Sequence, residues 1–143
     1  MKTTGEIVYR PDSSTQYLQS FFDVGVSAGF PSPAADYEEG KLDLNRHLIR
    51  NPAATFFVKA NGDSMIGAGI HSGDILIVDR SLEPKDKSVV IAVINGELTV
   101  KKIRIRNRKI ILEPENHNYP VQEITPDTDF EVWGVVTSVI HRL

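Results

Sequence analysis

The stretch SVVIAVINGELTVKKIRIR, residues 88–106, decides the fold of this chain. Two runs rich in Val, Ile and Thr, 88–94 and 97–106, flank the dipeptide Asn95-Gly96. Such residues favour strands, and both Asn and Gly tolerate the positive φ angles of a type I′ turn. The stretch therefore predicts a β-hairpin, and no other part of the sequence carries so strong a hairpin signal.

Further runs rich in β-branched and aromatic residues predict more strands on both sides of this hairpin. These runs are 55–60, 74–79, 109–113 and 130–141. Turn signals separate the runs, namely Asn61-Gly62-Asp63, Ser72-Gly73-Asp74, Glu83-Pro84 and Pro114-Glu115-Asn116. We therefore expect a mainly β protein, a partly rolled antiparallel β domain that begins at about Pro52.

The sequence before Pro52 has a different pattern. Residues 1–28 are mixed and polar, with a short apolar patch, and predict an extended N-terminal arm that docks weakly. Pro31 and Pro33 lack a backbone N–H and bias the residues before them toward extended geometry, so an extended segment is expected from Gly29 onward. One short helix is predicted after the N-cap candidate Asp43, with apolar positions at Leu42, Leu44, Leu48 and Ile49 and a stop at Asn51-Pro52.

Composition narrows the class of protein. A chain of 143 residues with 41% hydrophobic residues fits one compact domain with an arm. No apolar run approaches the roughly 18 residues of a membrane span, and the first ten residues lack the apolar core of a signal peptide, so we expect a soluble, cytoplasmic protein. The sequence contains no cysteine, which excludes disulfides, thiol catalysis and Cys-rich zinc sites.

The charge pattern argues against direct, sequence-specific DNA binding. The formal net charge is −3, so a general basic field around the chain is not expected. The run 101–109 is an exception, with six cations in nine residues. A strand with one solvated basic face is the favoured interpretation, and a nucleic-acid patch is the alternative.

The histidines predict no metal site. His47, His71, His117 and His141 are scattered and show no ligand spacing such as a helical pair at i and i+4. No glycine-rich phosphate loop occurs either, so no cofactor is expected. A serine-histidine pair of Ser64 and His71 is disfavoured, because no neighbouring motif supports it.

The tetrapeptide Gly62-Asp63-Ser64-Met65 follows the predicted strand 55–60 directly. On its own, Gly-Asp-Ser is most simply a turn. As a functional motif it exposes a serine on a tight turn, where the backbone N–H groups of 62–64 can converge on a developing oxyanion. Serine is a poor nucleophile until a base takes its proton, and a neutral lysine amine can do so.

Lys101 is the best candidate for that base. Strand alternation places it on the face of Ile103 and Ile105, where burial lowers a lysine pKa. Leu98 and Val100 fall on the opposite face, which requires either a bulge or burial on both faces. By this argument alone, an inward lysine is more often a snorkelling or paired residue than a catalytic one.

Several segments together resemble UmuD-type proteins of the LexA superfamily, the peptidase S24-like autoproteases. The matching segments are GFPSPAADY (29–37), LDLN (42–45), FVKA (57–60), GDSMI (62–66), GDILIVD (73–79) and GELTVKK (96–102), and WGVV (133–136) fits the closing strands. The resemblance implies a LexA/signal-peptidase-like rolled β domain and a Ser-Lys autoprotease. In such a protein Ser64 attacks the carbonyl of Ala28, neutral Lys101 accepts the serine proton, and the amine of Gly29 leaves.

The resemblance also implies a domain division and partners. Residues 1–28 are the arm removed by self-cleavage, and 29–143 form the protease and dimerisation domain. Cleavage is stimulated by a RecA filament on single-stranded DNA, and the processed homodimer serves a UmuC-type Y-family DNA polymerase in SOS mutagenesis. Gly62, Asp63 and Met65 form the nucleophile or oxyanion loop, and Met65 takes no part in the chemistry. This chain has Ala-Gly, as LexA repressors do, where UmuD usually has Cys-Gly.

Other classes of protein remain as alternatives. A transcriptional regulator of the phage-repressor or LexA kind needs a DNA-reading element, for which residues 1–28 leave no room. A non-cleaving structural dimerisation subunit needs neither Ser64 nor Lys101. An enzyme of the signal-peptidase kind, acting on other proteins, normally needs a membrane anchor, and none is expected here.

Overall fold

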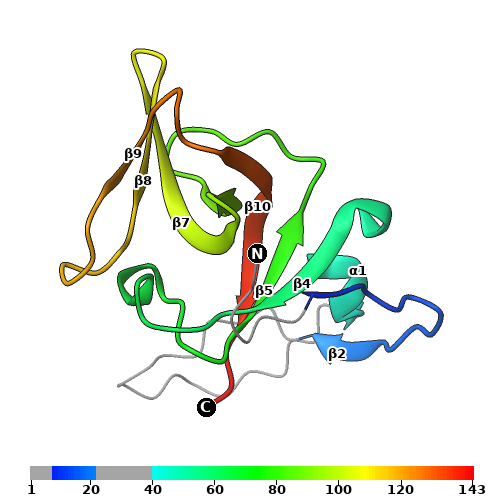
Figure 1. Ribbon diagram of the computed structural model, residues 1–143. Coiled ribbons are helices and arrows are strands. Elements are labelled where there is room, and N and C mark those ends of the chain that lie inside the picture. The colour runs from blue at the N-terminus through cyan, green and yellow to red at the C-terminus, as the bar shows by residue number, and fades with distance from the viewer. Residues whose placement is uncertain (1–7, 22–39) are drawn as a thin grey trace. The chain divides into compact units, whose positions relative to one another are not determined.

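The computed structural model describes residues 8–21 and 40–143 (Figure 1). The chain forms two compact units: Asp12–Arg50 is one, and Met1–Pro11 with Asn51–Leu143 is the other. Within the described residues, the larger unit contains an eight-stranded sheet whose order is β1-β4-β5-β10-β6-β7-β8-β9. Its strands are β1 (Val8–Tyr9), β4 (Thr55–Lys59), β5 (Ile75–Asp79), β6 (Val89–Ile94), β7 (Glu97–Arg106), β8 (Lys109–Glu113), β9 (Gln122–Ile124) and β10 (Phe130–Ile140). The neighbouring strands pair antiparallel, which confirms the mainly β prediction.

The smaller unit contains the predicted helix. Strand β2 (Gln19–Phe21) pairs with β3 (Gly40–Leu42), and α1 (Leu44–Leu48) follows directly. The carboxylate of Asp43 accepts a hydrogen bond from the amide of Asn45 at 3.1 Å, so Asp43 is the N-cap as predicted. The larger unit adds two short 3₁₀ turns, η1 (Pro52–Ala54) and η2 (Ile66–Ala68).

The hairpin at the centre of the sequence forms as expected. β6 and β7 pair in continuous register from Val89↔Lys102 to Ile94↔Glu97. Asn95 and Gly96 both have positive φ, 49° and 83°, as a type I′ turn requires. A second turn of this kind joins β7 to β8 through Asn107 and Arg108, with φ of 51° and 64°. This turn was not predicted, because an arginine seldom adopts a positive φ.

In the part of the chain that the structure describes, the core consists of two clusters on opposite faces of the rolled sheet. In β6, Ile91 belongs to the first cluster, whereas Val90 and Ala92 belong to the second. In β7, Leu98 is buried in the first cluster and Ile103 in the second. The sequence left open whether a bulge or burial on both faces of this strand explains the apolar residues Leu98 and Val100. β7 pairs with β6 and β8 without a register shift, so burial on both faces is the explanation.

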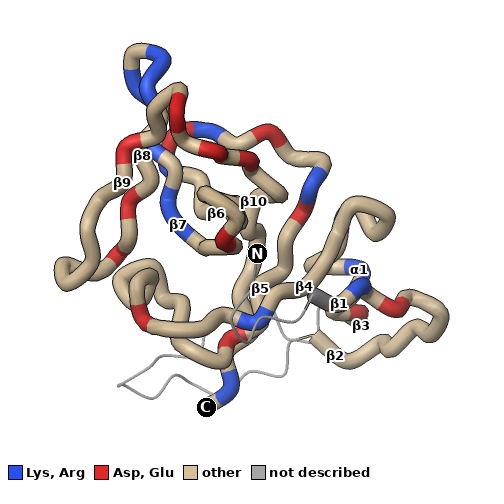
Figure 2. The backbone as a smooth tube through the Cα atoms, in the orientation of Figure 1, with Lys and Arg blue, Asp and Glu red and all other residues tan. Residues whose placement is uncertain are grey.

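The basic run lies along β7 and at the tip of the β7–β8 hairpin, and acidic residues lie on neighbouring strands (Figure 2). The guanidinium of Arg104 contacts Asp86 at 3.1 Å and Glu113 at 3.3 Å, and Lys102 pairs with Glu115. These ion pairs favour the interpretation of a solvated charged strand face. No helix in the described part of the chain is long and apolar enough to cross a membrane.

Candidate active site

Ser64 and Lys101 lie 37 residues apart in the sequence and meet in space. The Nζ atom of Lys101 is 2.9 Å from the Oγ atom of Ser64, within hydrogen-bond distance. Ser64 belongs to the turn after β4, and Lys101 lies at the middle of β7. The strand order separates these two strands by β5, β10 and β6, so the rolling of the sheet is what brings them together.

The turn that carries Ser64 is tied to the turn before β5. Ala60 exchanges backbone hydrogen bonds with Gly73 and Asp74, at 2.8 and 2.7 Å. Gly62 has a φ of +90°, which favours glycine, and its amide donates to the Oγ of Ser72 at 3.1 Å. Next to Ser64, the side chain of Met65 is 1% exposed and belongs to the first core cluster. The serine is therefore held between a fixed turn and a buried anchor.

Lys101 is suited to lose its proton more easily than an exposed lysine. Burial lowers the pKa of Lys101, because the ammonium form loses hydration that the neutral amine needs less. Among the residues that the structure describes, no carboxylate forms an ion pair with Lys101, whereas its neighbour Lys102 pairs with Glu115. The described residues therefore place no counter-charge beside this amine to favour its protonated form.

The loop between β8 and β9 holds the serine turn from the other side. The amide side chain of Asn116 donates to the carbonyl of Asp63 at 3.0 Å, and the Tyr119 hydroxyl donates to the Asp63 carboxylate. That hydrogen bond, followed by the carboxylate charge, raises the pKa of Tyr119. The amide of Gly67 donates to the carbonyl of Glu115 at 2.8 Å. Sequence reasoning recognised 114–116 only as a turn, since contacts 53 and 56 residues apart leave no local signal.

An open pocket of about 250 Å³ lies beside the pair. Its walls come from the serine turn, from the first half of β7 and from Tyr119; they are Asn61, Gly62, Asp63, Ser64, Glu97, Leu98, Thr99, Val100, Lys101 and Tyr119. In the described pairings, β8 contacts β7 only from Lys102 onward, so residues 97–101 pair with β6 alone. Residues 97–101, which line the pocket, thus have one edge without a described neighbouring strand.

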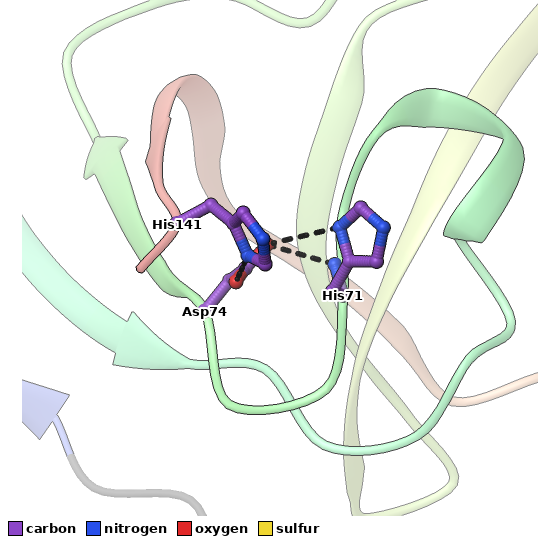
Figure 3. Close-up of side chains that lie close together, drawn as sticks. All are labelled: His71, Asp74 and His141. Atoms are coloured by element: carbon purple, nitrogen blue, oxygen red, sulfur yellow. Dashed lines mark hydrogen bonds and ion pairs between the residues drawn. The ribbon is translucent and has the colours of Figure 1, made fainter. Parts of the chain in front are cut away.

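A second cluster of side chains was not anticipated. His71 and His141 approach each other at 4.6 Å between ring centroids, around the carboxylate of Asp74 (Figure 3). The prediction that the histidines are scattered is therefore wrong for this pair. Burial alone would raise the pKa of Asp74, but hydrogen bonds from the His71 amide and the His141 ring hold it below its usual value.

The predicted cleavage site, Ala28 and Gly29, lies outside the described residues.

Comparisons with known proteins identify several relatives of this chain. Residues 20–137 match the family described as Peptidase S24-like. Protein ImpA of Salmonella typhimurium is 46% identical over 92% of this chain and 90% of its own length. Protein SamA of Salmonella typhimurium strain LT2 is 51% identical over 80% of this chain and 79% of its own length. The LexA repressor of Magnetococcus marinus is 35% identical over 80% of this chain, but that match covers 48% of the repressor.

Proposed function

The chain belongs to the Peptidase S24-like family, and from this premise we propose that it is a self-cleaving serine protease with a Ser64-Lys101 dyad. The bond it cuts is Ala28–Gly29. The observation that carries the proposal is the 2.9 Å contact between Lys101 Nζ and Ser64 Oγ. A half-buried lysine with no carboxylate partner among the described residues, next to a partly exposed serine on a tight turn, is an arrangement that activates a hydroxyl nucleophile.

The reaction follows from the chemistry of these two groups. Neutral Lys101 accepts the proton of Ser64, and the serine Oγ forms a bond to the carbonyl carbon of Ala28. The C–N bond then breaks, and the amine of Gly29 leaves with the proton that Lys101 returns. Water hydrolyses the resulting acyl ester and regenerates the serine.

The serine turn supplies the backbone for stabilising the oxyanion. The Gly62 amide already donates to Ser72, so we assign Gly62 the role of shaping the turn. The developing negative charge is left to amides closer to the nucleophile, in the stretch from Asp63 to Met65. The side chain of Met65 is buried in the core and serves as an anchor for this stretch.

The substrate is an extended segment of the same protein. Pro31 and Pro33 favour extended backbone after the scissile bond. An extended chain can pair with the edge of β7 at residues 97–101, which has no neighbour among the described strands. Ala28 and Gly29 have the smallest side chains available, so the bond can approach Ser64 closely. Under this proposal the chain divides into an arm, 1–28, and a processed domain, 29–143.

The pH dependence of cleavage tests the proposal directly. Because the pKa of Lys101 is lowered, the neutral fraction of its amine grows as pH rises toward that pKa, and the rate grows with it. We expect the rate to increase about tenfold per pH unit in this range and then to level off below pH 10.5, the usual lysine value. The measurement is mass spectrometry of the full chain incubated at a series of pH values up to about pH 10.

The expected product begins at Gly29 and ends at Leu143. An intact chain throughout the series, unchanged when RecA filaments on single-stranded DNA are added, would contradict the protease proposal. It would support the alternative of a non-cleaving dimerisation subunit.

Tyr119→Phe is expected to slow cleavage without preventing it. The variant removes the hydroxyl that donates to Asp63, next to the nucleophile, but keeps the ring. Without this hydrogen bond the turn that carries Ser64 is held less firmly, so we expect cleavage to slow about tenfold. Tyr9→Phe, which alters a tyrosine outside the pocket, is the control. Equal cleavage rates of the two variants would show that the Tyr119 hydroxyl does not position the serine turn.

Cleavage would also expose a new surface to which a partner can bind. β1 lies in the arm and pairs with β4, with Val8 opposite Val58 and Tyr9 opposite Phe57. Removal of residues 1–28 therefore uncovers the edge of β4, and an uncovered strand edge is a surface on which a partner can add. We propose that the processed form is a homodimer that serves a UmuC-type Y-family DNA polymerase in SOS mutagenesis, after RecA-stimulated cleavage. The similarity to the ImpA and SamA proteins over most of the chain supports this role.

A further inference from the structure

The cluster of His71, Asp74 and His141 is built by the pairing of β5 with β10. Asp74 directly precedes β5, and His141 directly follows β10. The two strands run antiparallel, with Ile75 opposite Ile140, so the start of one lies beside the end of the other. His71 enters from the turn before β5, three residues before Asp74. All three groups belong to the larger unit of the chain.

Asp74 is the buried centre of the cluster. Its side chain is 3% exposed, and both carboxylate oxygens face histidine (Figure 3). One oxygen lies 2.6 Å from the Nδ1 atom of His141. The other accepts the amide of His71 at 2.8 Å and lies 3.7 Å from the Nδ1 atom of the same residue. The rings of His71 and His141 are 48% and 44% exposed, so the cluster opens to solvent on the histidine side.

We propose that His71, Asp74 and His141 form a binding site for a divalent transition-metal ion of the zinc class. Two imidazole nitrogens and one carboxylate oxygen are the donors that such ions prefer, and three protein ligands with an open fourth position are a known zinc arrangement. One ligand atom from each residue lies within 4.8 Å of the others. The fourth position faces solvent, where water completes the coordination.

The distances fit with a small adjustment. Tetrahedral zinc, with bonds of about 2.0–2.2 Å, keeps its ligand atoms about 3.3–3.5 Å apart. The His71 Nδ1 atom is 3.7 Å from the Oδ2 atom of Asp74, close to this value, whereas His141 contacts the other oxygen, Oδ1. The 2.6 Å contact of His141 with Asp74 has to lengthen as the ion replaces the proton between them. His141 is half exposed, so its ring has room to turn while Asp74 stays in place.

A bound ion would act as a clamp on the larger unit. It would join the end of β10 to the turn 71–74, and that turn is hydrogen bonded to the serine turn through Ser72–Gly62 and Gly73–Ala60. The site is independent of the proposed dyad, since neither Ser64 nor Lys101 belongs to it. Because the ion binds the folded chain, its presence is expected to raise the melting temperature.

The experiment uses the full chain without a histidine tag, stripped of metal with a chelator that is then removed. Zn²⁺ is titrated by calorimetry, and Co²⁺ replaces it for visible absorption spectroscopy. The variants are His71→Gln and His141→Gln, both half-exposed side chains, and the matched control is His117→Gln, an exposed histidine outside the cluster. Circular dichroism of the metal-free proteins checks that each variant is folded.

The proposal predicts one Zn²⁺ per chain and Co²⁺ bands of a four-coordinate site. Each of the two cluster variants is expected to bind at least about tenfold more weakly, while His117→Gln binds like the parent. Absence of saturable binding, or equal binding by all three variants, would overturn the proposal. The cluster would then be a hydrogen-bond network in which two histidines hold the buried carboxylate.

Discussion

Replacing Lys101 with alanine is expected to leave the full chain uncut under conditions in which the parent chain separates at Ala28–Gly29. In the proposed mechanism, the amine 2.9 Å from Ser64 Oγ removes the serine proton, and a general base contributes about 10²–10⁴-fold to a rate. Ser64→Ala removes the proposed nucleophile, so no acyl intermediate is expected to form. Both variants are followed by mass spectrometry beside the parent chain at the same pH.

Lys102→Ala is the matched control for this prediction. Lys102 is the next residue on the same strand and pairs with Glu115 rather than with Ser64. Its removal costs a surface ion pair, worth about 0–1 kcal/mol, and cleavage is expected to continue near the parent rate. Cleavage by Lys101→Ala at the parent rate would contradict the role of Lys101 as base. Cleavage by Ser64→Ala would contradict the nucleophile assignment.

Loss of cleavage in Lys101→Ala is not expected to come from unfolding. The pKa of Lys101 is lower in the folded protein than in the unfolded chain. At any pH below the folded-state pKa, the charged ammonium therefore lowers the free energy of unfolding. This cost disappears as pH rises through the folded pKa to the unfolded one. Alanine has no charge to bury, so the variant is expected to resist denaturant at neutral pH about as well as the parent, and urea unfolding checks this.

Gly134→Ala is expected to lower the free energy of unfolding by about 1–3 kcal/mol. Gly134 is buried in β10, where the register with β6 shifts between Val132 and Gly134. A Cβ atom at this position would lie 2.7 Å from the Cγ1 atom of Val78 and 3.1 Å from the carbonyl oxygen of Asp79. The side chain of Val78 belongs to the first core cluster, and the carbonyl belongs to the β5 backbone. Neither atom can move aside without disturbing the packing of the core or the pairing of the strands.

The measurement is urea unfolding of Gly134→Ala, and Glu131→Ala is its control. Glu131 lies on the same strand with an exposed side chain, so its replacement is expected to change the free energy by less than about 0.5 kcal/mol. A Gly134→Ala protein as stable as the control would mean that β10 and β5 separate freely at this position, in contradiction to the close approach described above.

The positions of the longer strands could be predicted from local sequence patterns. The runs 55–60, 74–79, 88–94, 97–106, 109–113 and 130–141 correspond to β4, β5, β6, β7, β8 and β10 within one residue at each end. Propensity and turn geometry act over a few residues, and both are visible in the sequence. Four strands were not predicted, namely β1, β2, β3 and β9. Each is only two or three residues long, and its strand character comes from the neighbour with which it pairs.

By itself, the sequence determined the mainly β fold, the central hairpin, the Asp43 helix cap and the two candidate residues of the dyad. Only the tertiary structure shows that the side chains of these two residues are in contact. They are 37 residues apart in the sequence, and the rolling of the sheet brings them together. It also decided the support of the serine turn by Asn116 and Tyr119 and the meeting of His71, Asp74 and His141. The physical reason is the same in each case: strand register sets which distant side chains become neighbours, and register depends on the burial of whole strand faces, which no short stretch of sequence contains.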